Sequence, residues 1–227
     1  SFRGAPPWIA LLTATVLALA AAPVAAVRAP DVLTDADISI PGAGAVSLAD
    51  AKQRATLQTG APWVEFTARN GTWTALWNAR TGSPHRAFGP AIPLPGFADR
   101  SDGVEAAVRA FIAGNPALFG TPTLETTRVQ KVRGTWYVSF NQLVRGMPVL
   151  FNDWEFRVGA NGNLFAFGAD AHRVSDFDIP TIPRLPAAVA REAARAGLRF
   201  DPVRDRIEGG ESNALLPIAG EQGLTYR

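Results

Sequence analysis

The chain has 227 residues, of which 47% are hydrophobic and 19% are charged, a balance that allows it to bury a core in one large or two small domains. Its formal net charge is +2, and Lys and Arg are scattered rather than clustered, which argues against a nucleic-acid-binding surface. Cysteine is absent, which excludes disulfides and a thiol nucleophile.

The N-terminus has the pattern of a secretory signal peptide. Arg3 precedes an apolar run from Trp8 to Ala22, and small residues follow, so residues 1–26 predict export to the extracellular space, with membrane contact only during that export. The run is shorter than the ~20 residues of a membrane span, and an uncleaved anchor remains the alternative. Because the chain starts at Ser1 and stops at Arg227, we expect both ends to be truncated.

The next two segments differ in composition. Residues 27–46 are rich in Pro, Gly, Asp and Ala and predict a linker. For residues 47–97 we expect a small β-rich unit that opens on a short helix from Ser47 to Gln58. His85 to Phe88 predicts a short strand near its end, after a turn that includes Pro84.

A hairpin is expected within this unit. Residues alternate from Trp63 to Ala68 and again from Trp73 to Trp77, and Asn70-Gly71 lies between the two runs, a strong hairpin signal. Asn70-Gly71-Thr72 is also a glycosylation sequon, although the turn explains the same residues. The tryptophans of these runs would suit a sugar- or peptide-binding face, but cross-strand aromatic packing is the simpler interpretation.

The clearest helix starts at Ser101 or Asp102 and ends at Gly114. The spacing of Asp102 and Glu105 predicts a capping box. Apolar residues recur along one face of this helix and predict a buried stripe, formed by Val104, Val108, Phe111 and Ile112.

Three alternating runs then predict a β-meander: Trp136 to Leu143, Val149 to Val158 and Leu164 to Phe167. Thr127 to Arg133 is a candidate fourth strand. In the second run, Leu150 is expected to share the buried face with the aromatic residues that follow it. We therefore predict an α+β fold in which an antiparallel meander packs on the helix. Its predicted core contains Val108, Phe111, Trp136, Phe140, Trp154 and Phe156.

Beyond the meander, Pro186 suits the first turn of a second helix, which is predicted from Ala187 to Ala196 and ends at Gly197.

The run Asn141-Gln142-Leu-Val-Arg-Gly146-Met-Pro148-Val149, followed by the turn at Asn161-Gly162, resembles the fungalysin/thermolysin propeptide family. The resemblance covers roughly Asp99 to Arg227. Asn141 stands where the family usually has Gln, and Phe151-Asn152-Asp153 stands where small residues and Gly are common. The resemblance implies a cystatin/PepSY-like fold, with a propeptide-like helix and meander in residues 98–172 and an incomplete PepSY-like segment in residues 173–227.

The same resemblance implies the pro-region of a secreted zinc metallopeptidase. Such a region acts as an intramolecular chaperone and inhibitor of a catalytic domain that follows it in the same chain. No cofactor is expected in this chain, since zinc would belong to the catalytic domain. The polar face of the meander and an exposed edge near Asn141 are the candidate contact surface, which comprises Asn141, Gln142, Arg145, Asp153, Glu155 and Arg157. An extracellular PepSY/cystatin-like inhibitor or binding module without a protease is the alternative.

The sequence predicts no catalytic site of its own. His85 and His172 lack the spacing of an H-E-x-x-H helix and are expected to be solvated loop residues. The carboxylate pairs Asp153/Glu155 and Asp176/Asp178 are interpreted as solvent-facing rather than as acid–base pairs. No G-x-S-x-G nucleophile motif is present.

Overall fold

The computed structural model describes residues 46–174, 186–197, 201, 203–205, 213–220 and 223–226. Within them the protein is α+β, as predicted, with helices packed on an antiparallel sheet. The signal peptide predicted for residues 1–26, the linker up to residue 45, and the pair Asp176/Asp178 lie outside the described residues. None of the described helices is long and apolar enough to cross a membrane.

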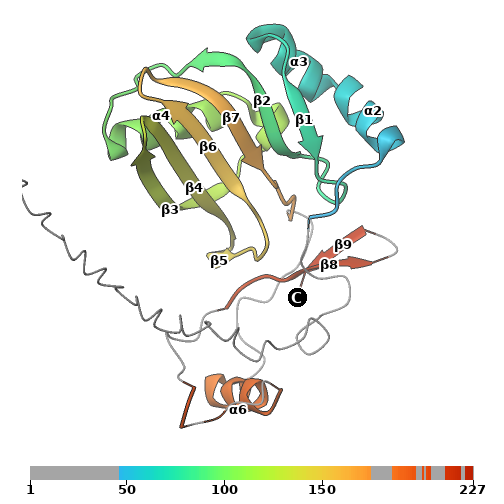
Figure 1. The fold of residues 1–227 in the computed structure, drawn as a ribbon. Coiled ribbons are helices and arrows are strands. Elements are labelled where there is room, and N and C mark those ends of the chain that lie inside the picture. Colours follow the sequence, from blue (N-terminus) through green and yellow to red (C-terminus); the bar gives the residue numbers. More distant parts are fainter. Residues whose placement is uncertain are drawn as a thin grey trace, which may run out of the picture.

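One seven-stranded sheet dominates the structure (Figure 1), with the strand order β1-β2-β7-β6-β4-β3 and with β5 paired to β4. The strands of this sheet are β1 (Thr74–Trp77), β2 (Pro84–Pro93), β3 (Thr123–Val132), β4 (Thr135–Val144), β5 (Met147–Pro148), β6 (Trp154–Gly159) and β7 (Asn163–Ala169). A separate two-stranded sheet pairs β8 (Pro217–Gly220) with β9 (Gly223–Tyr226).

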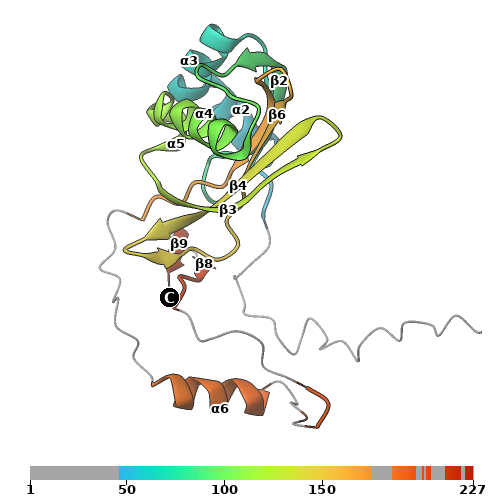
Figure 2. The same ribbon diagram turned by 90° about the vertical axis from the view of Figure 1, so that its left-hand side faces the viewer.

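Helices gather on one face of the large sheet, as Figure 2 shows for α3, α4 and α5. The helices are α2 (Ala51–Thr59), α3 (Ala61–Asn70), α4 (Ser101–Ala113), α5 (Pro116–Phe119) and α6 (Ala187–Gly197). No described helix covers the opposite face of the sheet, which we call the open face.

The predicted meander is present as β3, β4, β6 and β7, but its second run is interrupted. Residues 150–152 leave the sheet between β5 and β6, whereas Val149 still donates to the carbonyl of Gln142 and the carbonyl of Asp153 still accepts from the N–H of Asp170. Leu150 is therefore 40% exposed rather than buried, and its N–H donates to the carbonyl of Leu215 at 2.8 Å. The Asn152 side chain accepts a hydrogen bond from the N–H of Gln142, and Phe151 adopts a φ of 55°, so the strand cannot continue regularly.

The hairpin predicted around Asn70-Gly71 is wrong, because Trp63 to Ala68 is helical. Pro62 occupies the start of α3, and Gly71 ends the helix with a φ of 82°. Trp63 and Phe66, three residues apart, are buried on one side of α3, which is the helical spacing. The β-rich unit expected for residues 47–97 thus begins with two helices, and its strands β1 and β2 join the large sheet through β7.

The capping box predicted for α4 is also wrong. Its N-cap is Arg100, without a side-chain hydrogen bond, and Asp102 lies in the first turn. Glu105 instead accepts from the Thr126 hydroxyl at 2.6 Å and from Arg109 at 2.9 Å, which ties the helix to β3. In contrast, α2 begins as a capped helix, since Asp50 accepts from the N–H of residue 53.

The larger of two described hydrophobic clusters lies between the helices and the sheet, and it includes residues from both the N-terminal segment and the meander. The Phe66 ring of α3 lies 5.6 Å from the Trp73 ring and 5.6 Å from the Phe167 ring of β7. Among the predicted core residues, Phe111 is partly buried against this core, and the others are buried: Val108, Trp136, Phe140, Trp154 and Phe156.

Candidate functional site

A charged network crosses the open face. Glu155 of β6 binds two arginines: its carboxylate lies 2.9 Å from Arg128 of β3 and 2.9 Å from Arg157 of β6. The guanidinium groups of these arginines lie 5.8 and 5.5 Å from the ring centre of Tyr137. Residues alternate across a strand, so the strands that bury Trp154 and Phe156 direct Glu155 and Arg157 to the open face.

A second ion pair extends the network toward β2. Arg86 binds Asp153 and also donates to the carbonyl of His85 at 2.7 Å. Gly168 of β7 permits this arrangement, because a Cβ atom at that position would overlap Arg86 and the carbonyl of His85. Asp153, Glu155 and Arg157, which were predicted on a polar face, therefore lie on the open face in two neighbouring ion-pair groups.

The other predicted contact residues lie elsewhere. Asn141 is half-buried and pairs with Glu125 of β3, and Gln142 pairs with Leu124, so β3 covers the edge that was expected to be exposed. Arg145 is exposed in the turn between β4 and β5.

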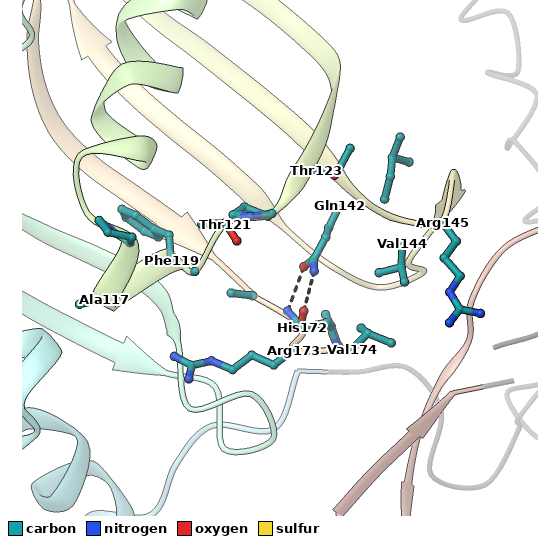
Figure 3. Close-up of a pocket in the computed structure, with 15 residues that line it drawn as sticks. Ala117, Phe119, Thr121, Thr123, Gln142, Val144, Arg145, His172, Arg173 and Val174 are labelled. Atoms are coloured by element: carbon teal, nitrogen blue, oxygen red, sulfur yellow. Dashed lines mark hydrogen bonds between the residues drawn. The ribbon is translucent and has the colours of Figure 1, made fainter. Parts of the chain in front are cut away.

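Gln142 is 5% exposed and holds a neighbouring segment in place. Its amide accepts a hydrogen bond from the N–H of His172 at 2.9 Å and donates to the carbonyl of His172 at 2.5 Å. Figure 3 shows this pair of hydrogen bonds. Because its polar atoms are engaged and buried, Gln142 is not part of an exposed contact surface on the sheet, contrary to the prediction.

Beside Gln142 lies a groove of about 620 Å³ (Figure 3). Three parts of the chain border this groove. They are α5 together with the loop that leads from it to β3, the end of β4, and residues 171–174. Its lining is mixed, with apolar side chains, threonines and two arginines: Pro116, Ala117, Phe119, Gly120, Thr121, Pro122, Thr123, Gln142, Leu143, Val144, Arg145, Ala171, His172, Arg173 and Val174.

A buried polar cluster lies near the end of β7. Asp170 is fully buried, and its carboxylate lies 2.9 Å from the Asn78 amide nitrogen and 2.9 Å from His85 Nδ1. Asp170 was not among the residues predicted from the sequence. The only sequence signal was its position immediately after a strand, and a contact with residues 78 and 85 requires the tertiary fold.

The histidines were predicted to be solvated, and this is wrong. The His85 side chain is 18% exposed and binds Asp170, and His172 is 7% exposed. Burial lowers the pKa of His172 to about 4, although nearby Asp170 acts in the opposite direction. His172 is therefore neutral at neutral pH.

The cluster contains an Asp–His pair, and Asp170 can orient the His85 ring. The hydroxyl of Ser83, two residues before His85, accepts from the N–H of Ala171 and pairs with Thr81. Among the described residues, no hydrogen bond joins Ser83 to His85, and no group of three or more His, Asp or Glu side chains is placed to hold a metal ion. The interactions that the cluster does form fix the loop before β2 against the end of β7.

No model of a known protein family matches this chain, and no curated protein matches it significantly in sequence.

Proposed function

We propose that this chain is the pro-region of a secreted thermolysin- or fungalysin-like zinc metallopeptidase, which assists the folding of a catalytic domain downstream in the same precursor and inhibits it until cleavage. The observation that carries the proposal is the open face: a sheet supported by a large core on one side, with a charged and aromatic surface on the other. The motif from Asn141 to Val149 supports the choice of family.

The architecture suits a folding template. The core fixes the backbone of β4 and β6, so the side chains on the open face are ordered before any partner arrives. A surface that binds the native catalytic domain and not its unfolded form stabilises the native domain by mass action. The same contacts inhibit the enzyme if they cover its substrate cleft.

The contact surface in this proposal is the polar part of the open face, centred on Glu155 and Arg157 and extending to Asp153. Arg128 and Tyr137 complete it, because they form one group with Glu155. Arg145 and Asn141 lie toward one end of β4. Partly exposed ion pairs of this kind contribute little to stability, which leaves them available for partner selection.

The test uses purified residues 27–227 and the domain encoded directly after Arg227. That domain is denatured and refolded with and without the purified chain, and its proteolytic activity is measured after the chain is removed. We expect a higher yield of active enzyme with the chain, and inhibition when the chain is added to the native enzyme. If the chain changes neither yield nor activity, the proposal is wrong.

A charge reversal locates the surface. Arg157→Glu places two carboxylates side by side on the open face and is expected to weaken inhibition about tenfold or more. Arg54→Glu on α2, exposed and outside the open face, is the matched control and should inhibit like the wild type. The sequence that follows Arg227 distinguishes the pro-region from the alternative function. An H-E-x-x-H motif there supports a pro-region, and a repeat array or anchor supports a binding module without a protease.

A further inference from the structure

We propose that Arg128 and Arg157 on the open face form a clamp for a single carboxylate on the surface of the catalytic domain. The clamp rests on the proposed function and deepens it, because it specifies the chemical group that the open face recognises. Three observations point to this ligand. One carboxylate holds both guanidinium groups, the guanidinium groups are more exposed than that carboxylate, and the surface beside them is nearly flat.

Glu155 holds the two arginines in place. Its carboxylate lies 2.9 Å from Arg128 of β3 and 2.9 Å from Arg157 of β6, so side chains from the strands on either side of β4 (Figure 1) meet at one anion. Both guanidinium groups also lie over the ring of Tyr137, 5.8 and 5.5 Å from its centre, within the range of a cation–π contact. These contacts order two long side chains before a ligand arrives, which lowers the entropy that binding costs.

The arginines of this group are more exposed to solvent than the carboxylate is. The side chain of Glu155 is 16% exposed, whereas those of Arg128 and Arg157 are 47% and 38% exposed. Two positive charges against one negative charge leave the group with a net positive charge. Among the described residues, no hydrogen bond uses Nη1 of either arginine. Both arginines therefore keep N–H donors for an incoming carboxylate.

Acidic residues elsewhere on this face limit the ligand to one anionic group. Asp153 is bound to Arg86 on the side of the face toward β2. Glu125, which pairs with Asn141 toward one end of β4, is exposed. A ligand with many anionic groups, such as a nucleic-acid backbone, would lie against these carboxylates and be repelled by them. A single carboxylate at the clamp matches the charge without that repulsion.

The surface beside the clamp suits a folded protein rather than a small molecule. Ala166 and Gly168 of β7 leave a hollow there, bordered by Arg157 and Phe88. Its volume is only about 10 Å³, far below the roughly 300–1,000 Å³ of small-molecule sites. Phe88 is 47% exposed and offers apolar surface next to the clamp. A partner protein that carries its carboxylate beside an apolar side chain can contact both.

The test measures how strongly purified residues 27–227 inhibit the domain encoded directly after Arg227. Arg128→Gln and Arg157→Gln each remove one guanidinium group without adding a negative charge, and each is expected to raise the inhibition constant about tenfold. The corresponding Lys variants should weaken inhibition less, because Lys keeps the charge but loses the planar fork of donors. Arg54→Gln on α2, exposed and outside the open face, is the control and should inhibit like the wild type.

The outcomes separate the clamp from the proposed function. If the wild type inhibits and both Gln variants inhibit equally well, the clamp is wrong and the pro-region function stands. If the wild type does not inhibit at all, the proposed function is wrong, and the clamp with it. Thermal unfolding of each variant shows whether a loss of inhibition comes from a loss of folding, and the Lys variants, which keep the ion pairs with Glu155, supply the comparison if a Gln variant is unfolded.

A charge swap identifies the ligand group on the partner. Each exposed Asp and Glu of the catalytic domain is replaced by Lys in turn, and each variant domain is tested with the wild-type chain and with Arg157→Glu. We expect one replacement to weaken inhibition by the wild type and to improve inhibition by Arg157→Glu about tenfold. If no replacement improves it, the ligand is not a carboxylate. Stronger inhibition of the unmodified domain by Arg157→Glu than by the wild type would indicate a basic partner group and would overturn the clamp.

Discussion

His172 shows how strongly the fold changes the chemistry of a single residue. The sequence around it suggests a polar loop, yet Gln142 holds its main chain and the residue is buried. Burial makes the imidazole of His172 costly to protonate, and this outweighs the opposite effect of Asp170. The consequence is a measurable dependence of stability on pH.

The pKa of His172 is about 4 in the folded chain against 6.5 for the free side chain. Between these values the unfolded state binds the proton and the folded state does not, so stability falls as the pH is lowered from 6.5 to 4. The expected loss is on the order of 3 kcal/mol. Urea unfolding at pH 7 and at pH 4.5 measures it.

The control for this prediction is His172→Gln, which removes the titrating ring and keeps the main-chain hydrogen bonds to Gln142. We expect the difference in stability between the two pH values to shrink in this variant. An identical pH dependence in both proteins would show that His172 does not cause it.

Asp170 is a second residue whose contribution to stability depends on its environment in the fold. Asp170→Ala leaves the Asn78 amide and the His85 ring without their partner. We expect a loss of about 2–5 kcal/mol, since each unsatisfied buried group costs roughly 1–3 kcal/mol. Asp153→Ala is the matched control, because it removes a partly exposed ion pair with Arg86 and should cost less than about 1 kcal/mol. Equal losses in denaturant unfolding would contradict a structural role for Asp170.

At the scale of elements, α3 is the main difference between prediction and structure. Val64, Phe66 and Ala68 alternate with polar residues, and in a window of ten residues this pattern also fits a helix that buries Trp63 and Phe66. Asn70-Gly71 fits a hairpin turn and a helix C-terminus equally well, because both use a glycine with positive φ. The local sequence is therefore compatible with both a hairpin and a helix.

Substitutions on α3 test the helix. Phe66→Ala removes a fully buried ring that contacts Trp73 and Phe167, and we expect a loss of about 3–5 kcal/mol. Val64→Ala, at a position that is 48% exposed, should change stability by less than about 0.5 kcal/mol. In a strand that buries Val64 and Phe66 on the same face, both substitutions would be costly. Thermal unfolding distinguishes these outcomes.

The interrupted strand between β5 and β6 has a similar cause. The alternating pattern from Val149 to Val158 predicts one strand, and the register of Trp154 and Phe156 with β4 agrees with it. Residues 150–152 leave the ladder because the Asn152 side chain accepts from the N–H of Gln142 and because Leu150 pairs with Leu215, far along the chain. A hydrogen bond to a residue so far along the chain does not change the alternating pattern of the local sequence, so the pattern does not predict the interruption.

For the whole molecule, the shared core joins segments that the sequence analysis divided at residue 97. Strands β1 and β2 continue the sheet beyond β7, and α3 packs against the ring of Phe167. A sheet without these elements would expose one side of its central aromatic cluster. Residues 46–97 are thus part of the structure on which the meander depends.

A truncation tests this dependence. A fragment of residues 98–174 lacks Phe66 and Trp73, and we expect it to show no cooperative thermal transition, because the apolar surface left exposed removes much of the driving force for folding. Residues 46–227 are the control and should unfold cooperatively. A sharp transition in the short fragment would show that the meander and α4 fold alone.

Local patterns in the sequence alone determined the α+β class, the meander around Trp136 and Trp154, the buried stripe of α4 and the polar residues of the open face, because strand and helix periods are local properties. The tertiary structure decided the identity of α3, the continuous sheet, the burial of His172 and Asp170, and the groove beside Gln142. Each of these depends on contacts between residues far apart in the chain, such as Asn78 with Asp170, and burial of a polar group becomes favourable only when such a partner is in place.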